Sequence, residues 1–232
     1  MVALITGASR GLGLAIAEAL AQEGLDLILW SRNETLLKEN STRLAQSYGI
    51  SVNVTALDLS NQEQIDQACQ SLLDQGSTVD LLVNNAGNFL PGAMMEESES
   101  QLDDLWSVNV KAAYTITKRL WPALVQSPRA HVVNICSTAS RMGYPAGGSY
   151  AVTKHALLGF SESLRLEGRP LGIRVSSVLP GAALTDSWAG VDLPEERFMK
   201  ASDVGAVVRQ IWQLNQSAVI EDITLRPLLG DI

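Results

Sequence analysis

The residues best suited to chemistry lie between Ser137 and Lys154, in a stretch that ends in Tyr150-Ala-Val-Thr-Lys154. On a helix, Tyr150 and Lys154 would lie one turn apart on the same face. A phenol has a reference pKa of about 10, and a neighbouring ammonium group lowers that pKa by favouring the phenolate. Such a tyrosine can donate a proton to a carbonyl oxygen or accept one from an alcohol. Ser137 could place a second hydroxyl on the same oxygen, although the Tyr-x-x-x-Lys spacing alone also arises by chance.

A glycine-rich segment, Thr6 to Gly13, follows the apolar run 2–5 and precedes a periodic apolar segment that stops at Gly24. This order predicts a strand, a tight turn and a helix. Glycines let the backbone approach a ligand, and a helix N-terminus offers free N–H groups, so the turn suits a pyrophosphate. The alternative is a turn that uses glycine for its geometry alone.

The next apolar run, 25–30, ends in Ser31-Arg32-Asn33, where a dinucleotide fold places the adenosine ribose. No acidic residue stands there to bind the ribose hydroxyls. Arg32, with Arg10 from the glycine turn, would instead favour a 2′-phosphate through charge-assisted hydrogen bonds. Arg32 could also be a solvated loop residue. Asp58 could contact adenine or serve only as a strand-end acid, and Ser60 is the expected N-cap of the helix that follows.

The elements that must position these residues alternate between strands and helices along the whole chain. The strands are expected at 2–5, 25–30, 51–57, 79–83, 130–136, 173–179 and 219–225. This alternation predicts the α/β class, with a single domain over 1–232 and one Rossmann-type, doubly wound parallel sheet of about seven strands in the order 3-2-1-4-5-6-7. Asn109 interrupts an apolar helical stretch, where it either satisfies a backbone bend or holds a water near the site.

Composition narrows the class of protein. The chain has 232 residues, of which 46% are hydrophobic, and a formal net charge of −8 without a basic block, which argues against nucleic acid or an anionic membrane as partner. No apolar run reaches the ~20 residues of a membrane span. The N-terminal residues 1–5 lead directly into the first expected strand without a charged leader, so no signal peptide is expected. Cys69 and Cys136 fit no metal spacing, so we expect no metal and two buried thiols in a reducing cytoplasm.

Together these residues resemble the short-chain dehydrogenase/reductase family, in the branch typified by 3-oxoacyl-carrier-protein reductases. The resemblance covers essentially the whole chain. It rests on motifs that follow one another in the family's order: Thr6-Gly7-x3-Gly11-x-Gly13, Asn84-Asn85-Ala86-Gly87, Asn109, Ser137, Tyr150-x3-Lys154, and Pro180-Gly181 followed by Thr185. It implies an NADP(H)-dependent oxidoreductase that reduces a ketone or aldehyde, 3-oxoacyl compounds among the candidates.

The resemblance also implies a role for each residue of a catalytic set. Tyr150 would be the general acid in reduction, and Lys154 would lower its pKa and bind the nicotinamide ribose. Ser137 would hold the substrate carbonyl, and Asn109 would hold a water that links Lys154 to solvent. The cofactor residues implied are Gly7, Ser9, Arg10, Gly11, Leu12, Gly13, Arg32, Asp58, Leu59, Asn85, Ala86, Gly87, Tyr150, Lys154, Pro180, Gly181, Ala183 and Thr185.

The substrate side is expected at a loop spanning about 182–202, which is short and suggests an open or partner-completed pocket. Candidate pocket residues are Leu90, Met94, Met142, Tyr144 and Trp188. The apolar helix over 151–166, and the family's habit of pairing its long helices, predict a homodimer or homotetramer. Two alternatives stay open: an NAD-dependent alcohol dehydrogenase of the same family, and a non-catalytic NADP-binding sensor, against which the intact set of four catalytic residues argues.

Overall fold

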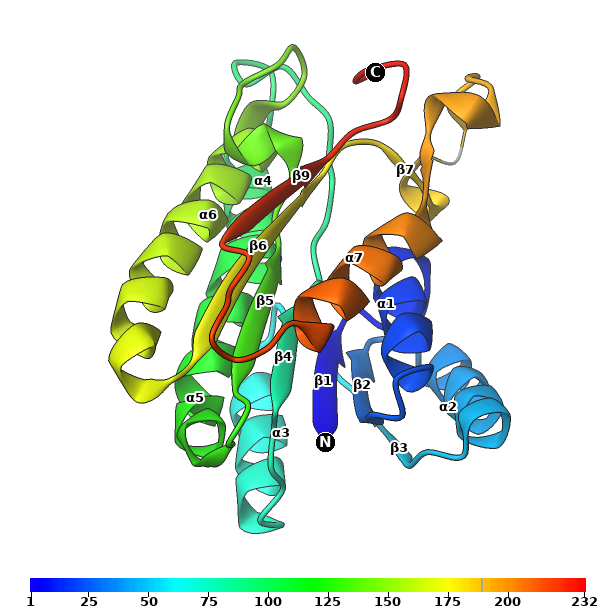
Figure 1. The fold of residues 1–232 in the computed structure, drawn as a ribbon. Coiled ribbons are helices and arrows are strands. Elements are labelled where there is room, and N and C mark those ends of the chain that lie inside the picture. Colours follow the sequence, from blue (N-terminus) through cyan, green and yellow to red (C-terminus); the bar gives the residue numbers. More distant parts are fainter. Residues whose placement is uncertain (189) are drawn as a thin grey trace.

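The computed structural model describes residues 1–188 and 190–232, and its centre is a seven-stranded sheet whose neighbouring strands pair in parallel (Figure 1). The strands are β1 (Val2–Thr6), β2 (Asp26–Ser31), β3 (Val52–Ala56), β4 (Leu81–Asn84), β5 (His131–Ile135), β6 (Arg174–Pro180) and β9 (Asp222–Leu225). They lie in the order β3-β2-β1-β4-β5-β6-β9. Because β9 is the seventh strand of this sheet along the chain, the predicted order and the doubly wound α/β class are confirmed.

Helices cover both faces of the sheet, with α1, α2 and α7 on one side and α3 to α6 on the other (Figure 1). Their bounds are α1 (Gly11–Ala21), α2 (Glu34–Tyr48), α3 (Gln62–Asp74), α4 (Glu99–Trp106), α5 (Ala112–Gln126), α6 (Gly148–Gly168) and α7 (Ala201–Gln213). A π-helical turn, η1 (Ser107–Lys111), joins α4 to α5. Short 3-10 turns are η2 (Thr138–Ser140), η3 (Arg169–Leu171), η4 (Asp186–Trp188) and η5 (Glu195–Arg197).

The central strands are buried and largely apolar because each face of the sheet packs against a helical layer. Successive residues of a strand point to opposite faces. Leu81 and Val83 of β4 therefore pack into the core beneath α1 and α7, while Leu82 packs into the core beneath α3 and α5. All three side chains are fully buried. The two cores hold the strands rigidly, so the loops that follow the strands start from fixed points.

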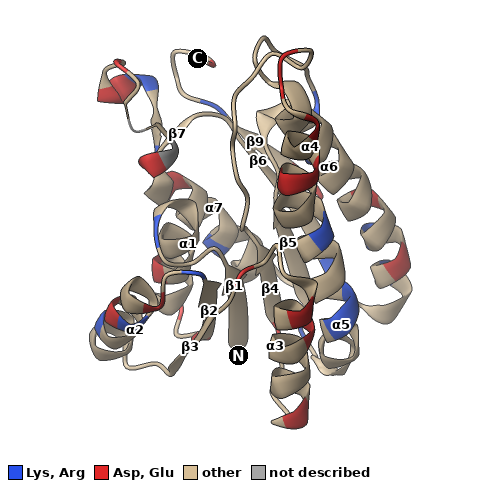
Figure 2. Cartoon of the chain, turned by 180° about the vertical axis from the view of Figure 1, so that it is seen from behind, with Lys and Arg blue, Asp and Glu red and all other residues tan. Residues whose placement is uncertain are grey.

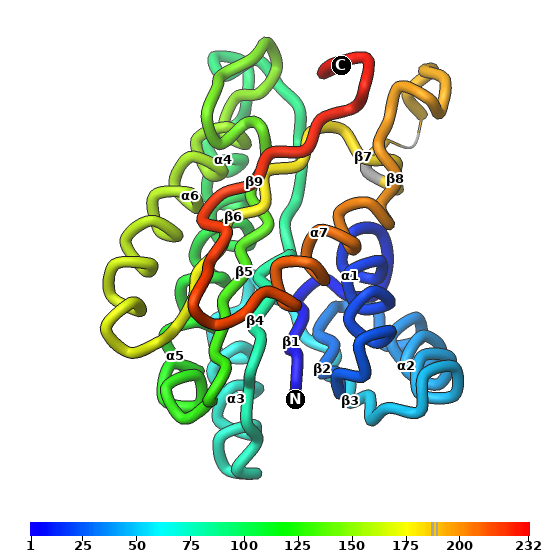
Figure 3. Tube along the Cα trace, viewed as in Figure 1, coloured from blue at the N-terminus to red at the C-terminus, as the bar shows by residue number. Residues whose placement is uncertain are grey.

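Those loops meet because parallel strands end at the same edge of the sheet, the upper edge in Figure 3. The register pairs Asn84 at the end of β4 with Asn134 of β5, and Ile135 with Val178 of β6. The sheet order changes direction between β1 and β4, and such a switch point opens a crevice between the loops on either side. The glycine turn after β1, the segment after β4 and Ser137 after β5 all lie at this edge.

The structure corrects two details of the sequence analysis. The helix expected to begin behind Ser60 is capped by Asn61, whose Oδ1 accepts the backbone N–H groups of Glu63 and Gln64 at 3.0 and 3.2 Å, while the Ser60 hydroxyl donates to Asp58 at 2.8 Å. The segment taken as one loop over 182–202 also contains a small parallel ladder, β7 (Ala183–Leu184) with β8 (Met199–Lys200). The ladder ties the two ends of this loop together. The loop includes Ala189, which lies outside the described residues.

Charged side chains of both signs are distributed over the outer helices (Figure 2). Figure 2 shows acidic residues along α3 and basic residues along α5. One pair joins these helices, with Arg119 Nε 2.9 Å from Asp66 Oδ1. Within the part of the chain that the structure describes, no helix has the length and apolar character that crossing a bilayer demands.

Candidate active site

Two adjoining cavities open at the carboxyl edge of the sheet. The first, of about 240 Å³, is lined by Ser137, Tyr150 and Lys154, and we call it the Tyr150 pocket. The second, of about 430 Å³, is lined by the turn from Gly7 to Gly13, and we call it the glycine-turn pocket. The two share several walls, namely Leu12, Asn85, Gly87, Asn88, Phe89 and Thr185. An elongated ligand could therefore extend from one into the other.

The serine and tyrosine of the predicted set reach the Tyr150 pocket from different elements. Ser137 follows β5 and caps η2, where its hydroxyl accepts the N–H of Ala139 at 3.1 Å and its own N–H donates to Ser140 at 3.2 Å. Tyr150 lies in the first turn of α6. Phe89, from the segment after β4, packs edge-on against the Tyr150 ring with centroids 4.9 Å apart. These contacts hold both hydroxyl-bearing side chains at one cavity wall.

Lys154 lies one helical turn beyond Tyr150, as its spacing predicts, and is buried. Its ammonium donates to the carbonyl oxygen of Ile135 at 2.9 Å and lies 5.8 Å from the centroid of the Tyr150 ring. A cation removed from water in this way needs partners, and the protein supplies this carbonyl. The rest of its hydrogen-bonding capacity can serve a ligand in the pocket.

The pKa of Tyr150 is raised in the protein alone, against the expectation that Lys154 lowers it. Burial of the phenol is the largest cause, because it penalises the phenolate, and a hydrogen bond from Ser137 opposes it. Burial also lowers the pKa of Lys154 itself. The ammonium is held by the Ile135 carbonyl rather than by the phenol, which explains why desolvation prevails.

Neither cysteine is activated as a nucleophile or metal ligand. Burial raises the pKa of Cys136 to about 11 and that of Cys69 to about 12, so both remain thiols at neutral pH. Both are free and buried, as expected. The described residues also hold no cluster of three or more His, Cys, Asp or Glu side chains that could bind a metal ion.

Asn109 lies behind both pockets, in the π-helical turn η1, and is buried. Its Oδ1 accepts the N–H of Asn88 at 2.7 Å, and its Nδ2 donates to the carbonyl of Asn88 at 3.0 Å and to Thr153 at 3.1 Å. The side chain thus satisfies the backbone after β4 and ties it to α6, rather than a bend in its own helical stretch. Its role in holding a water stays a prediction.

The glycine turn packs too tightly for any side chain at two positions. Gly7 has φ +67°, and a Cβ there would lie 2.9 Å from Asn85 Nδ2. A Cβ on Gly13 would overlap the carbonyl oxygen of Gly7. Arg10 precedes α1 without capping it through its side chain, so the first N–H groups of that helix have no side-chain acceptor. Such groups, with the positive end of the helix dipole, suit an anionic ligand.

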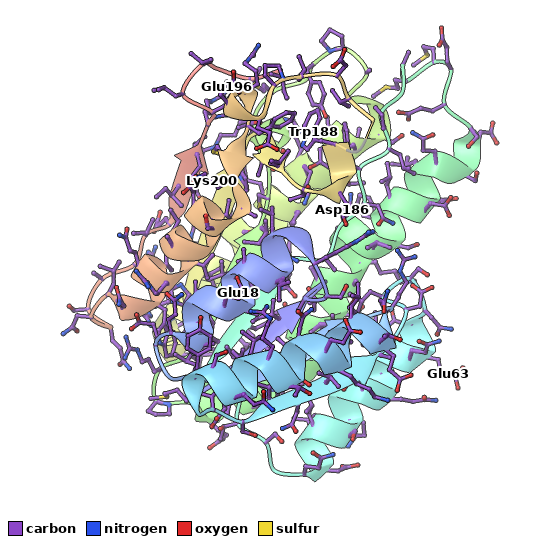
Figure 4. The ribbon with its side chains drawn as sticks, turned by 90° about the vertical axis from the view of Figure 1, so that its right-hand side faces the viewer. Glu18, Glu63, Asp186, Trp188, Glu196 and Lys200 are labelled. Atoms are coloured by element: carbon purple, nitrogen blue, oxygen red, sulfur yellow. The ribbon has the colours of Figure 1, made fainter. Side chains whose placement is uncertain are left out.

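The predicted ribose end of the glycine-turn pocket is lined by Arg32 and Asp58. Arg32 is exposed, and the backbone N–H of Ser60 is the main cause that lowers the pKa of Asp58. Arg10 lines the same pocket, but its guanidinium pairs with Asp186 of the loop after β6 at 2.9 Å (Figure 4). Sequence reasoning missed this pair, since 176 residues separate its members.

The structure places every predicted cofactor residue at one of the two pockets. The glycine-turn pocket is lined by Gly7, Ser9, Arg10, Gly11, Leu12, Gly13, Arg32, Asp58, Leu59, Asn85, Ala86, Gly87 and Thr185. The Tyr150 pocket is lined by Tyr150, Lys154, Pro180, Gly181, Ala183 and Thr185.

The predicted substrate residues separate into three groups. Met142, Tyr144 and Trp188 line the Tyr150 pocket as expected. Leu90 lines the glycine-turn pocket instead, and Met94 lines neither, because its side chain points to solvent and is 51% exposed. Sequence reasoning missed other lining residues, namely Asn88, Phe89, Ala182, Asp231 and Ile232. Phe89 could have been predicted, because it is a large aromatic residue only two positions beyond Gly87, which was expected to line the cofactor site.

The start of α6 is held by a carboxylate from another segment. Gly147 precedes the helix and caps nothing through a side chain. Glu97 instead accepts the Ser149 N–H at 3.1 Å and the Ser149 hydroxyl at 2.5 Å. Gly148 has φ +34°, and a Cβ there would overlap Glu97. The residue after Ser149 is Tyr150, so this contact helps to set where the phenol lies.

Comparison with known proteins gives a consistent result. The model of the short chain dehydrogenase family matches residues 1–196. A 3-oxoacyl-[acyl-carrier-protein] reductase of Vibrio cholerae is 32% identical over 206 residues, which cover 88% of this chain and 82% of that protein. Two solved structures also superpose closely. An alcohol dehydrogenase from Thermococcus sibiricus, complexed with 5-hydroxy-NADP, has a TM-score of 0.93 and 29% identity, covering 100% of this chain and 98% of that one. L-sorbose reductase from Gluconobacter frateurii, complexed with NADPH and L-sorbose, has a TM-score of 0.88 and 27% identity, covering 97% and 95%.

Proposed function

The chain belongs to the short-chain dehydrogenase family, and from that premise we propose that it uses NADP(H) to reduce a ketone or aldehyde reversibly to an alcohol. The observation that carries the proposal is the single cavity in which Ser137, Tyr150 and Lys154 meet beside the glycine turn. The NADP-type cofactors in the alcohol dehydrogenase and the L-sorbose reductase support the choice of cofactor. The Vibrio reductase supports 3-oxoacyl compounds as one candidate class of substrate.

In this proposal the bound cofactor supplies a hydride to the carbonyl carbon. Tyr150 donates its phenolic proton to the carbonyl oxygen, and the raised pKa keeps that proton in place at neutral pH. Ser137 donates a hydrogen bond to the same oxygen and stabilises the negative charge that develops there. The Lys154 ammonium stabilises the phenolate left behind, and protons from solvent then restore the phenol.

The glycine-turn pocket fits the phosphates of a dinucleotide. Gly7 and Gly13 keep the backbone open to a close approach, and the first N–H groups of α1 face that space without a side-chain acceptor. Arg32 would bind the 2′-phosphate, because it is exposed at the pocket and Ser31, not an acid, precedes it. Asp58 and Leu59 would flank the adenine.

The direct test replaces the proton donor. Tyr150→Phe should lower turnover of a ketone panel by about a thousandfold or more, since general acid catalysis and placement of the proton are both lost. NADPH binding, followed by the fluorescence of the reduced nicotinamide, should stay within about threefold of the parent protein because the phosphate turn is untouched. Turnover near the parent rate in Tyr150→Phe would refute the assigned role. Binding of NADPH without turnover of any ketone by the parent would favour a sensor.

The proposal includes a homodimer or homotetramer in the cytoplasm. Tyr114 of α5 and Val152 and Leu166 of α6 are large apolar side chains that stay exposed, Leu166 at 66%. The apolar helix over 151–166 predicts such an assembly, and a second copy would cover the face that one chain leaves open. Sedimentation of the purified protein measures the mass directly, and a monomer at micromolar concentration would contradict this part of the proposal.

A further inference from the structure

The segment after β9 closes one side of the Tyr150 pocket. The chain passes over the carboxyl edge of the sheet there, beside the segment that leads from β6 to β7 (Figures 1 and 3). Asp231 and Ile232 line the pocket. The Asp231 side chain approaches the backbone so closely that a Cβ on Gly181 would lie 3.0 Å from its Oδ1. A specific charged side chain therefore belongs to the wall opposite the catalytic helix.

Few side chains of this wall carry a charge. Among the side chains of the described lining residues, those of Lys154 and Asp231 are the two that are charged at neutral pH. Lys154 lies on the catalytic helix and donates to the Ile135 carbonyl, so Asp231 is the charge on the wall that the segment after β9 forms. Phe89, Trp188 and other apolar or aromatic side chains make up much of the remaining wall. A substrate whose carboxylate lies beside Asp231 would meet a like charge there and lose water.

A cation lies just outside the wall. The Arg226 guanidinium pairs with Asp231 and also lies 3.7 Å from the sulfur of Met142, which lines the pocket. Arg197 donates to the backbone oxygen of Asp231 at 3.4 Å and helps to fix the segment. Asp231 therefore holds Arg226 in an ion pair that an anionic substrate would have to break.

We propose that Asp231 makes this pocket selective for neutral, apolar or aromatic ketones and aldehydes, and that it excludes substrates carrying a carboxylate. This inference rests on the proposed reductase function. It assigns Asp231 a role in specificity and leaves the proton transfer to Tyr150. It also predicts that the selectivity depends on the negative charge of Asp231. The neutral amide of Asp231→Asn has the same shape but would not hold Arg226, which could then turn toward the pocket.

The test compares one skeleton with and without a charge, methyl 4-acetylbenzoate and 4-acetylbenzoate. The parent protein should show a kcat/KM for the ester at least roughly tenfold above that for the acid. Asp231→Asn should reduce this ratio by about tenfold, because the repulsion goes and Arg226 becomes free. Arg226→Gln should raise the ratio, because Asp231 keeps its charge and loses its partner. Glu196→Gln, at an exposed carboxylate of η5 that lines neither pocket, is the matched control and should not change the ratio (Figure 4).

Asp231→Asn and Arg226→Gln break the same ion pair, so a loosened C-terminal segment alone would move the ester-to-acid ratio in the same direction for both. Shifts in opposite directions therefore identify the charge as the cause. Equal or better use of the acid by the parent protein, or shifts in one direction for both variants, would overturn the inference. Calorimetric binding of the two compounds to the protein with NADP⁺ gives the same ratio without turnover. A preference for the ester in binding, with no turnover of these two compounds or of any ketone of the panel, would refute the reductase and retain the selectivity. Turnover without a preference for the ester would support the reductase and refute the selectivity.

Discussion

Replacing Glu97 by alanine removes the carboxylate that holds the start of the helix carrying Tyr150. The lost contacts are two hydrogen bonds from Ser149, at 3.1 and 2.5 Å, to a partly buried acceptor. Hydrogen bonds to a charged group contribute about 1.5–3 kcal/mol each when buried, and loss of a helix cap costs about 1 kcal/mol. Since Glu97 is partly exposed, we expect Glu97→Ala to lose about 2 kcal/mol of unfolding free energy in total. For a chain of this size, that lowers Tm by about 4–8 °C.

Glu97→Ala should also lower the rate of catalysis, because Tyr150 is the next residue after Ser149. We expect kcat for ketone reduction to fall by about tenfold or more, since a displaced proton donor is costly. KM for NADPH should stay within about twofold, because Glu97 lines neither pocket. Glu97→Gln, which keeps an acceptor of the same length without the charge, should lie between the parent and Glu97→Ala.

Glu96→Ala is the matched control, because Glu96 is the exposed neighbour of Glu97 and lines neither pocket. Thermal unfolding followed by circular dichroism, together with steady-state kinetics under the same conditions, measures both effects. The reasoning is refuted if Glu97→Ala and Glu96→Ala unfold at the same temperature with equal kcat. A loss of stability with unchanged kcat would leave Glu97 as a helix cap alone.

Two further changes test the cofactor and the phenol. Arg32→Ala should weaken NADPH binding by about tenfold or more and leave NADH within about twofold, because one charge-assisted bond to a 2′-phosphate is worth about 1.5–3 kcal/mol; equal losses in a fluorescence titration would count against that contact. Absorbance at the phenolate band, taken as parent minus Tyr150→Phe without cofactor, should show no ionisation of Tyr150 below about pH 10, because burial raises its pKa. The linked stability is present at lower pH and lost as the pH rises through the raised pKa, so an ionisation near neutrality would contradict the burial argument.

Local patterns were enough to predict much of the fold and the centre of the site. The alternation of apolar runs and helical segments yields the seven-stranded order, and the helical period places Tyr150 and Lys154 on one face. The position of Ser137 follows from the end of β5. These features depend on residues close in sequence and on where strands end. The periodicity of apolar residues reveals both.

Contacts between distant segments could not be predicted in this way. Asp231 reaches the Tyr150 pocket only through the path of the chain after β9, and Met94 points to solvent although it follows a segment that lines both pockets. The pKa of Tyr150 was expected to fall because of Lys154, yet burial sets its direction, and burial depends on Phe89 and other side chains from elsewhere in the chain. Tertiary packing decides each of these outcomes.

The π-helical turn between α4 and α5 also bears on which insertions and deletions the chain can tolerate. A π turn holds about one residue more than a turn of the α-helices around it. Deleting one residue from 107–111 would tighten this turn to the α-helical period and leave α4 and α5 nearly in phase, because the wider turn already absorbs the extra residue. The tighter turn would move Asn109 away from the backbone of Asn88 and break the hydrogen bonds between them. Descendants of this sequence should therefore vary in length at the exposed loops and keep the length of this turn.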